Sequence, residues 1–369
     1  MDDLYTQSGT HFFAASNTKE GFISYFDKIF DENECDKVYI IKGGPGCGKS
    51  TFMKKLGLVA EANGFHPEYF HCSSDPSSLD GIIIKEKKTA VIDGTNPHTL
   101  EPKFAGAREI IIDLGAAWNT DKLYENIKEI KRLSLVKSNC YYDCYRFLNS
   151  KSVMESLVYN LIFQHIFFDK LDRSALRLSK KLFGTKQKNT KGESKIRITE
   201  AMSGLGKTRF YSFEKMSDYC IFLKEPFEGC RLAHMFMSAV HEYAKKSGFA
   251  SYVSKSSDKK DEINALYFPD IKTSISLFDE SIVNDCDRKF KRCKIVNCAR
   301  FLDTKAISHT KPLRKFYCKL SENMEKQALE SLELAGKAHA DTEKIYRQCT
   351  CYKTVEKITS DYIKKIIGT

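Results

Sequence analysis

Long apolar runs are missing from this sequence of 369 residues. The longest candidate, from Ser156 to Phe168, is shorter than the roughly 18 to 20 residues that a membrane span needs, and polar residues interrupt it. The amino-terminal stretch MDDLYTQSGT lacks the basic start and apolar core of a secretion signal. We therefore expect a cytoplasmic protein without a membrane partner, in which the segment 156–168 is a buried helix.

Cysteine pairs at metal-ligand spacing are also missing. None of the 13 cysteines stands in a CxxC pair, and 13 is an odd number. Without an export signal, such cysteines are most simply free thiols in a reducing compartment. The spacing disfavours a zinc site. The closest pairs in sequence are Cys140 with Cys144, Cys293 with Cys298, and Cys349 with Cys351.

The composition is that of an ordinary globular protein. Hydrophobic residues make up 42% and charged residues 29%, which excludes a collagen-like, low-complexity or wholly disordered chain. With 59 Lys and Arg against 48 Asp and Glu, the net charge is +11, which favours an anionic ligand or a nucleic-acid surface. At roughly 150 residues per domain, the length predicts two or three domains.

The first motif with chemical content is GGPGCGKS, from Gly43 to Ser50. It fits the P-loop pattern GxxxxGK[ST] without a mismatch. A short apolar, β-branched run at Val38–Ile41 precedes it, and a helical pattern begins at Lys49. Strand, glycine-rich loop and helix therefore follow one another in the order that a phosphate-binding loop requires.

Each residue type in this loop has a physical reason. Gly43, Gly46 and Gly48 let backbone N–H groups close around phosphate oxygens without a Cβ clash. Lys49 would place a positive charge on the β- and γ-phosphates, and Ser50 would hold Mg²⁺. The amino-terminal end of the helix adds N–H donors. We expect a nucleoside triphosphate with Mg²⁺ at this loop.

Magnesium bound in this way needs an acid at the end of a second strand. Thr89–Ile92 is predicted to be a strand, and Asp93 stands at its carboxyl end, where ligands bind in open α/β sheets. The alternative is an ordinary turn aspartate before Gly94. With further strand candidates at EYFHCSSD and at Glu109–Leu114, the pattern predicts an α/β fold with a parallel sheet covered by helices on both faces.

The residue that activates water is not evident. Gly94 occupies the position at which many hydrolytic P-loop enzymes carry a glutamate after the aspartate. Asp75 ends the neighbouring predicted strand, where it could deprotonate a phosphoryl acceptor, and His98 could contact the γ-phosphate. Each is also consistent with a turn or capping role. The full set of candidates is Asp75, Asp80, His98 and Glu101.

The second half of the chain repeats the first at a constant offset. Gly64 of ANGF and Gly248 of KSGF define this offset, and the Lys-Thr pairs at 88–89 and 272–273 keep it. We predict a tandem duplication of a P-loop NTPase-like α/β lobe with a helical extension. The predicted parts are a P-loop NTPase domain at 1–118, a helical extension at 119–183, a basic linker at 184–196, a degenerate second domain at 197–305 and a second helical extension at 306–369.

The phosphate loop itself is not repeated. KEPFEGCRLAH stands opposite GGPGCGKS, keeps one glycine, Gly229, and has no lysine facing Lys49. Asp93 falls opposite Leu277, or at best near Asp279. The second lobe is therefore expected to be a pseudo-enzyme used for packing or regulation.

A second loop-like match, AMSGLGKT from Ala201 to Thr208, is interpreted as a decoy. The repeat places Thr208 opposite Thr10, ahead of the first strand of the lobe, and RFYSF does not begin a helix.

Four segments together resemble a poorly characterised family of bacterial tandem P-loop ATPases. They are HFFAASNTKEGFISYFD, IIKGGPGCGKST, HCSSDPSSLDG and VIDGTNPHTLEPKFAGA. The resemblance implies two similar lobes, ATP as ligand, and a site formed by Asp93 and the loop. Members often keep a glycine and lysine loop in the second lobe, from which this chain departs. The matching loop positions are Gly43, Gly44, Pro45, Gly46, Cys47, Gly48, Lys49, Ser50 and Thr51.

Three functions stay open at this stage. The leading hypothesis is an ATPase that converts nucleotide occupancy into movement between lobes, with Lys49, Asp93, Asp75 and His98 as candidate catalytic residues and Ser50 and Asp93 as Mg²⁺ ligands. A nucleotide or small-molecule kinase is the alternative, because GGPGCGK is similar to the loop of nucleoside monophosphate kinases. A nucleic-acid-associated ATPase is the third, motivated by RKFKRCK at 288–294. A homo-oligomer is a further open possibility.

Overall fold

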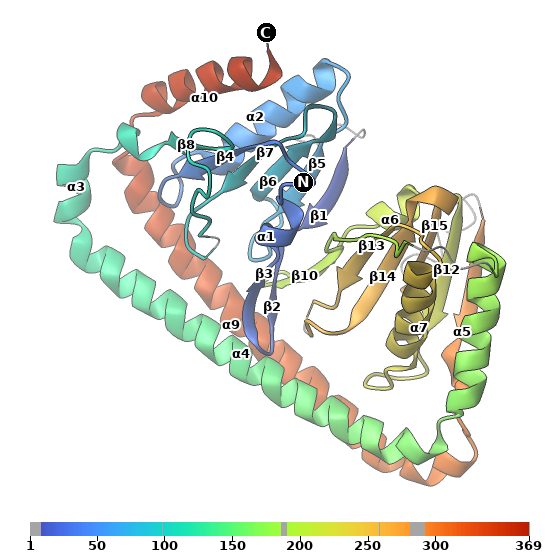
Figure 1. The fold of residues 1–369 in the computed structure, drawn as a ribbon. Coiled ribbons are helices and arrows are strands. Elements are labelled where there is room, and N and C mark those ends of the chain that lie inside the picture. The colour runs from blue at the N-terminus through green and yellow to red at the C-terminus, as the bar shows by residue number, and fades with distance from the viewer. Residues whose placement is uncertain (1–8, 98, 186–189, 258, 281–291, 369) are drawn as a thin grey trace.

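The structure is a computed structural model that describes residues 9–97, 99–185, 190–257, 259–280 and 292–368. Two six-stranded sheets with their helices lie along one side of a pair of long helices that run in opposite directions (Figure 1). Among the described residues, no helix is long and apolar enough to cross a membrane.

The first sheet is mixed and not fully parallel as predicted. Its strand order is β1-β5-β6-β7-β4-β8, and β6 runs antiparallel to both of its neighbours. The prediction missed β6 because Asp80 and Gly81 interrupt its apolar run; both are buried in the structure. The strands are β1 (Thr10–Phe13), β4 (Lys37–Lys42), β5 (Glu68–His71), β6 (Leu79–Ile84), β7 (Thr89–Asp93) and β8 (Glu109–Asp113).

The second sheet has the same strand order and the same pairing directions as the first. Its order is β9-β13-β14-β15-β12-β16, and the offset from Gly64 to Gly248 also relates the starts of β14 and β15 to those of β6 and β7. Residues 194–196, predicted to end a linker, form the edge strand β9. The strands are β9 (Ser194–Ile196), β12 (Tyr219–Lys224), β13 (Ser251–Lys255), β14 (Ile263–Phe268), β15 (Thr273–Leu277) and β16 (Cys293–Asn297).

A hairpin follows the edge strand in each half: β2 (Ala15–Thr18) with β3 (Gly21–Ser24), and β10 (Glu200–Ser203) with β11 (Gly206–Arg209). The segment AMSGLGKT forms the second hairpin, so it encloses no helix amino terminus. Lys207 Nζ lies 3.1 Å from Glu325 Oε2. The predicted pairing of Thr208 with Thr10 is wrong, because Thr208 belongs to the counterpart of the β2–β3 hairpin.

Shorter helices pack on the sheets. α2 places its apolar face, Phe52, Met53 and Leu56, in the core of the first lobe. The helices of this group are α1 (Phe26–Ile29), α2 (Lys49–Ala62), α3 (Thr120–Glu125), α6 (Ser212–Lys215) and α7 (Leu232–Lys246). The 3-10 turns are η1 (Lys85–Lys87), η2 (Gly115–Ala117), η3 (Phe163–His165), η4 (Pro269–Ile271), η5 (Cys298–Phe301) and η6 (Ala306–Thr310).

The long helices exchange partners between the two halves. α4 (Ile127–Ile162) spans about 54 Å at 1.5 Å per residue, which carries the chain from the first lobe to the second (Figure 1). There α5 (Phe168–Phe183) packs on α7 in the core of the second lobe. In return, α9 (Lys311–Gln348) leads back, and α10 (Tyr352–Ile367) packs on α2 of the first lobe.

Two sequence expectations about the helical extensions change. The extension 119–183 leaves the lobe that precedes it, and the bridge between Ile166 and Leu302 fastens its end to the second lobe. The bridge between Trp118 and Thr350 fastens the end of α9 to the first lobe in the same way. The predicted single helix over 156–168 is wrong, because α4 ends at Ile162 and the exposed Phe163 begins a 3-10 turn.

Candidate phosphate-binding site

The loop Gly43–Gly48 joins the carboxyl end of β4 to the first residue of α2. Gly46 and Gly48 have φ angles of +68° and +99°, which disfavour side chains. A Cβ atom at Gly43 would lie 2.6 Å from Cys47 Sγ. Glycine is therefore favoured at all three positions of this loop.

Lys49 lies across this loop. Its ammonium group donates hydrogen bonds to the carbonyl oxygens of Gly43 (2.9 Å) and Gly44 (2.8 Å). Lys49 Nζ is also 3.6 Å from Asp93 Oδ2. Because β4 and β7 are adjacent and parallel, with Ile41 opposite Asp93, both charged groups meet at the carboxyl edge of the sheet.

Asp93 is held in a fixed orientation. Its Oδ1 atom accepts hydrogen bonds from the backbone N–H (2.9 Å) and the hydroxyl (2.6 Å) of Thr95. Burial raises the pKa of Asp93, the charge of Lys49 opposes this, and the carboxylate of Asp80 adds to it. Asp80 lies on β6 and is buried, so two carboxyl groups share this edge.

The residues present fit a magnesium ion. Ser50 Oγ accepts a hydrogen bond from the N–H of Leu79 (3.0 Å), which fixes the hydroxyl at the start of β6. A divalent cation beside Asp93 would favour its charged form against burial and against Asp80. No described group of three or more His, Cys, Asp or Glu residues could hold a metal. Phosphate and water oxygens would complete the octahedral shell that Mg²⁺ prefers.

The other sequence candidates are placed differently. Asp75 is exposed, and its Oδ1 atom accepts hydrogen bonds from the N–H (3.0 Å) and hydroxyl (2.7 Å) of Ser77, as in a turn. The Glu101 side chain is 78% exposed and lies 3.1 Å from Lys42. Thr51 is exposed in the first turn of α2. His98 lies outside the described residues.

Residues from the far end of the chain cover the loop, and no sequence pattern indicated them. Tyr352 Oη donates a hydrogen bond to the carbonyl of Gly46 (3.0 Å), which lies 306 residues away in sequence. Gly44 lies under the rings of Tyr346 and Trp118, which leave no room for a Cβ atom. The α9–α10 junction is therefore part of the surroundings of the loop.

The second lobe keeps the loop path but not its chemistry. Gly229 and Arg231 have φ angles of +77° and +64°, and Arg231 precedes α7 as Gly48 precedes α2. Counted from the helix starts, Leu232 replaces Lys49 and Ala233 replaces Ser50. The salt bridge of Arg231 Nε with Glu262 Oε1 (2.6 Å) holds the arginine in a conformation that favours glycine.

Carboxylates and lysines of the chain itself occupy this second loop. Glu225 Oε1 accepts a hydrogen bond from the N–H of Ala233 (2.6 Å), a donor at the amino-terminal end of α7. Burial raises the pKa of Glu225 to about 6. Lys151 on α4 lies 3.3 Å from both Glu228 and Glu325. An internal anion therefore takes the place that a phosphate would need.

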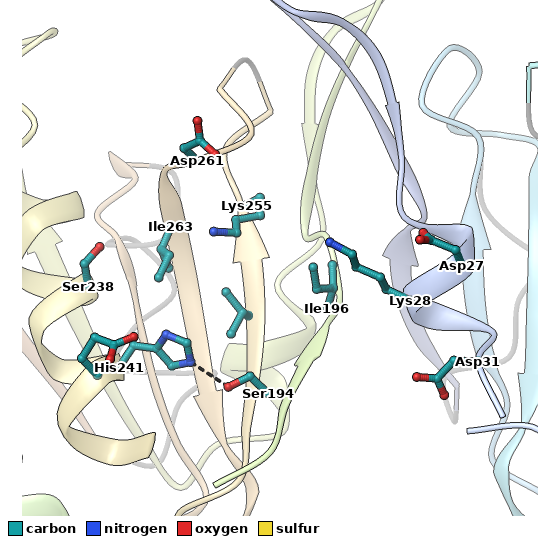
Figure 2. Close-up of a pocket in the computed structure, with 12 residues that line it drawn as sticks. Asp27, Lys28, Asp31, Ser194, Ile196, Ser238, His241, Lys255, Asp261 and Ile263 are labelled. Carbon is teal, nitrogen blue, oxygen red and sulfur yellow. Dashed lines mark hydrogen bonds between the residues drawn. The ribbon is translucent and has the colours of Figure 1, made fainter. Parts of the chain in front are cut away.

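A cavity to which the loop contributes no residue lies between α1, β9, β13 and α7 (Figure 2). Its volume is about 580 Å³. Ser194 Oγ lies 2.9 Å from His241 Nε2, and burial lowers the pKa of His241 to about 4. No sequence motif indicated its lining residues, which are Asp27, Lys28, Asp31, Ser194, Ile196, Ser238, His241, Glu242, Val253, Lys255, Asp261 and Ile263.

No protein-family model, curated protein or solved structure matches this chain.

Proposed function

We propose that this chain is a P-loop ATPase that binds ATP and Mg²⁺ at the first loop and hydrolyses the nucleotide slowly. The observation that carries the proposal is the position of Lys49, between the loop carbonyls and Asp93 at the carboxyl edge of the sheet. An incoming triphosphate would compete with those carbonyls for the ammonium group. The neighbouring N–H groups of α2 would add donors for the same phosphates.

The roles of the other residues follow from their positions. Ser50 and Asp93 would hold Mg²⁺, which neutralises charge that develops on the β- and γ-phosphates. Thr95 keeps the Asp93 carboxylate oriented through two hydrogen bonds. No described residue is assigned to the activation of water, so we expect slow turnover in the absence of a partner or acceptor.

We also propose that the two halves arose by tandem duplication and that only the first retains a nucleotide site. The shared strand order and the constant offset support the duplication. The Glu225 carboxylate at the amino-terminal end of α7 supports the loss of the second site. Because α4 and α9 contact both lobes, nucleotide occupancy of the first loop could change the position of the second lobe.

Calorimetric titration of the full chain with ATP and Mg²⁺ tests the proposal. We expect one site per chain. Lys49→Ala should weaken binding roughly 10- to 100-fold, because a charge-assisted hydrogen bond contributes about 1.5–3 kcal/mol. Lys207→Ala is the matched control and should bind like the wild type, since Lys207 lies in a hairpin. Equal losses in both variants, or no binding to the wild type, would contradict the proposal.

Turnover measurements separate the ATPase from the two alternatives. Phosphate release by the chain alone supports the proposed ATPase. ADP formation that requires an added metabolite would instead indicate a kinase. Strong, salt-dependent stimulation by DNA or RNA would indicate the nucleic-acid-associated enzyme. Of the basic stretch that motivated this last alternative, residues 288–291 lie outside the described residues.

A further inference from the structure

The first long helix presents one face to the phosphate site. Tyr141 on α4 has its Oη atom 2.8 Å from Ser74 Oγ, in the loop between β5 and β6. That loop ends at Leu79, whose N–H donates to Ser50. Lys137 lies one turn before Tyr141 on the same helix face. The stretch 137–141 therefore faces the β5–β6 loop, whose far end holds the hydroxyl of Ser50.

In the second lobe, the stretch of α9 that corresponds to 137–141 contacts the loop before α7. The offset that relates β14 to β6 also relates Ser321 to Lys137, and Ser321 Oγ donates a hydrogen bond to Glu228 Oε1 (3.3 Å). Glu228 belongs to the loop that precedes α7. Since both halves share strand order and helix offset, Lys137 holds the place in the first lobe from which Ser321 reaches the second loop.

The charges around Lys137 suit an anion. Lys137 is partly buried, and within the described part of the chain it makes no hydrogen bond or ion pair. Burial lowers the pKa of Lys137, and the positive charge of Lys49 lowers it further. Burial also lowers the pKa of His339 on α9; Lys137 adds to this effect, and Glu343 opposes it. An anionic group placed between Lys137 and Lys49 would relieve the repulsion between these two ammonium groups.

We propose that Lys137 binds the γ-phosphate of the nucleotide in the first loop and makes the site prefer a triphosphate to a diphosphate. This inference rests on the proposed function. The γ-phosphate is the expected contact because Lys137 approaches from the side of Ser50, the residue that would hold Mg²⁺ and with it the terminal phosphates. The contact would also link the nucleotide to α4, which continues into the second lobe.

Calorimetric affinities for two probes test this assignment on the full chain. The probes are ADP and an ATP analogue whose bridging oxygen between the β- and γ-phosphates is an NH group, each with Mg²⁺. Lys137→Met removes the charge but keeps most of the apolar stem. We expect at least roughly 10-fold weaker binding of the analogue and less than about 2-fold change for ADP. Lys137→Arg should recover most of the loss.

Lys131→Met, an exposed lysine on the same helix, is the matched control and should leave both affinities unchanged. Equal weakening of ADP and analogue by Lys137→Met would overturn the inference, because it would indicate a structural role. Unchanged affinity for the analogue would also overturn it, and the proposed function would stand. If the wild type binds neither probe, the proposed function itself fails.

Discussion

Replacement of Glu225 by glutamine should stabilise the protein at alkaline pH and much less at acid pH. Burial raises the pKa of Glu225 from the ordinary value of 4.5 to about 6. The folded state therefore holds its proton at a pH where the unfolded state has lost it. Stability conferred by this group falls as the pH rises from about 4.5 to 6 and then stays low. Glutamine does not titrate and keeps an oxygen that can accept from Ala233.

The size of the expected stability change follows from the raised pKa of Glu225. At about 1.36 kcal/mol per pKa unit, the ionised carboxylate costs about 2 kcal/mol at pH 8. The same relation gives about 0.8 kcal/mol at pH 5, where part of the unfolded chain is still protonated. Glu225→Gln should therefore raise the free energy of unfolding by about 2 kcal/mol at pH 8, and by less than half of that at pH 5.

Urea unfolding of both proteins at the two pH values measures this difference. Glu242→Gln is the control, because Glu242 is an exposed residue on α7 in the same lobe. It should change stability equally at both pH values. A gain for Glu225→Gln that does not depend on pH, or a loss at pH 8, would refute the conclusion that a largely buried carboxylate fills the second loop.

Two further predictions concern the way the lobes are joined. Arg197→Ala should lower the free energy of unfolding by about 3 kcal/mol, because the fully buried guanidinium donates to Glu34 and Glu68 (2.9 Å each) and its loss leaves these buried carboxylates with Lys195 and Lys85 as partners at one oxygen each. The exposed Arg132→Ala is the control, and equal effects of the two substitutions in urea unfolding would contradict this prediction. In a fragment of residues 1–184, α5 loses the second lobe that covers its apolar face. We therefore expect this fragment to form dimers or larger species in light scattering. A monomer with cooperative unfolding would contradict the packing of α5 on the second lobe.

The loop itself was predictable because its parts are local. Strand, glycine-rich turn and helix occupy consecutive residues, and glycine is favoured at 43, 46 and 48 by a contact and by φ angles within the same loop. Asp93 could be placed beside Lys49 from sequence because carboxyl ends of adjacent parallel strands meet at one edge. The antiparallel β6 was missed, because the polar Asp80 and flexible Gly81 obscure its apolar pattern.

The packing partners of the helices could not be predicted from the sequence. The sequence predicted helical extensions at 119–183 and 306–369, which contain α5 and α10, yet it did not say which lobe would cover them. Lys137 and His339 could not be selected from sequence, because only the paths of α4 and α9 bring them near enough to Lys49 to feel its charge. The filling of the second loop by Glu225 was likewise invisible, although the loss of its lysine was plain.

The sequence by itself determined the strand, loop and helix of the first lobe, the constant offset between the two halves and the absence of a P-loop lysine from the second loop. Tertiary structure decided that each helical extension covers the opposite lobe, and hence which side chains surround the first loop. The physical reason is the separation in sequence between the residues that interact. Backbone conformation in a loop is set by neighbours a few residues away, whereas the partner of an apolar helix face is set by competition among surfaces that are far apart in the chain.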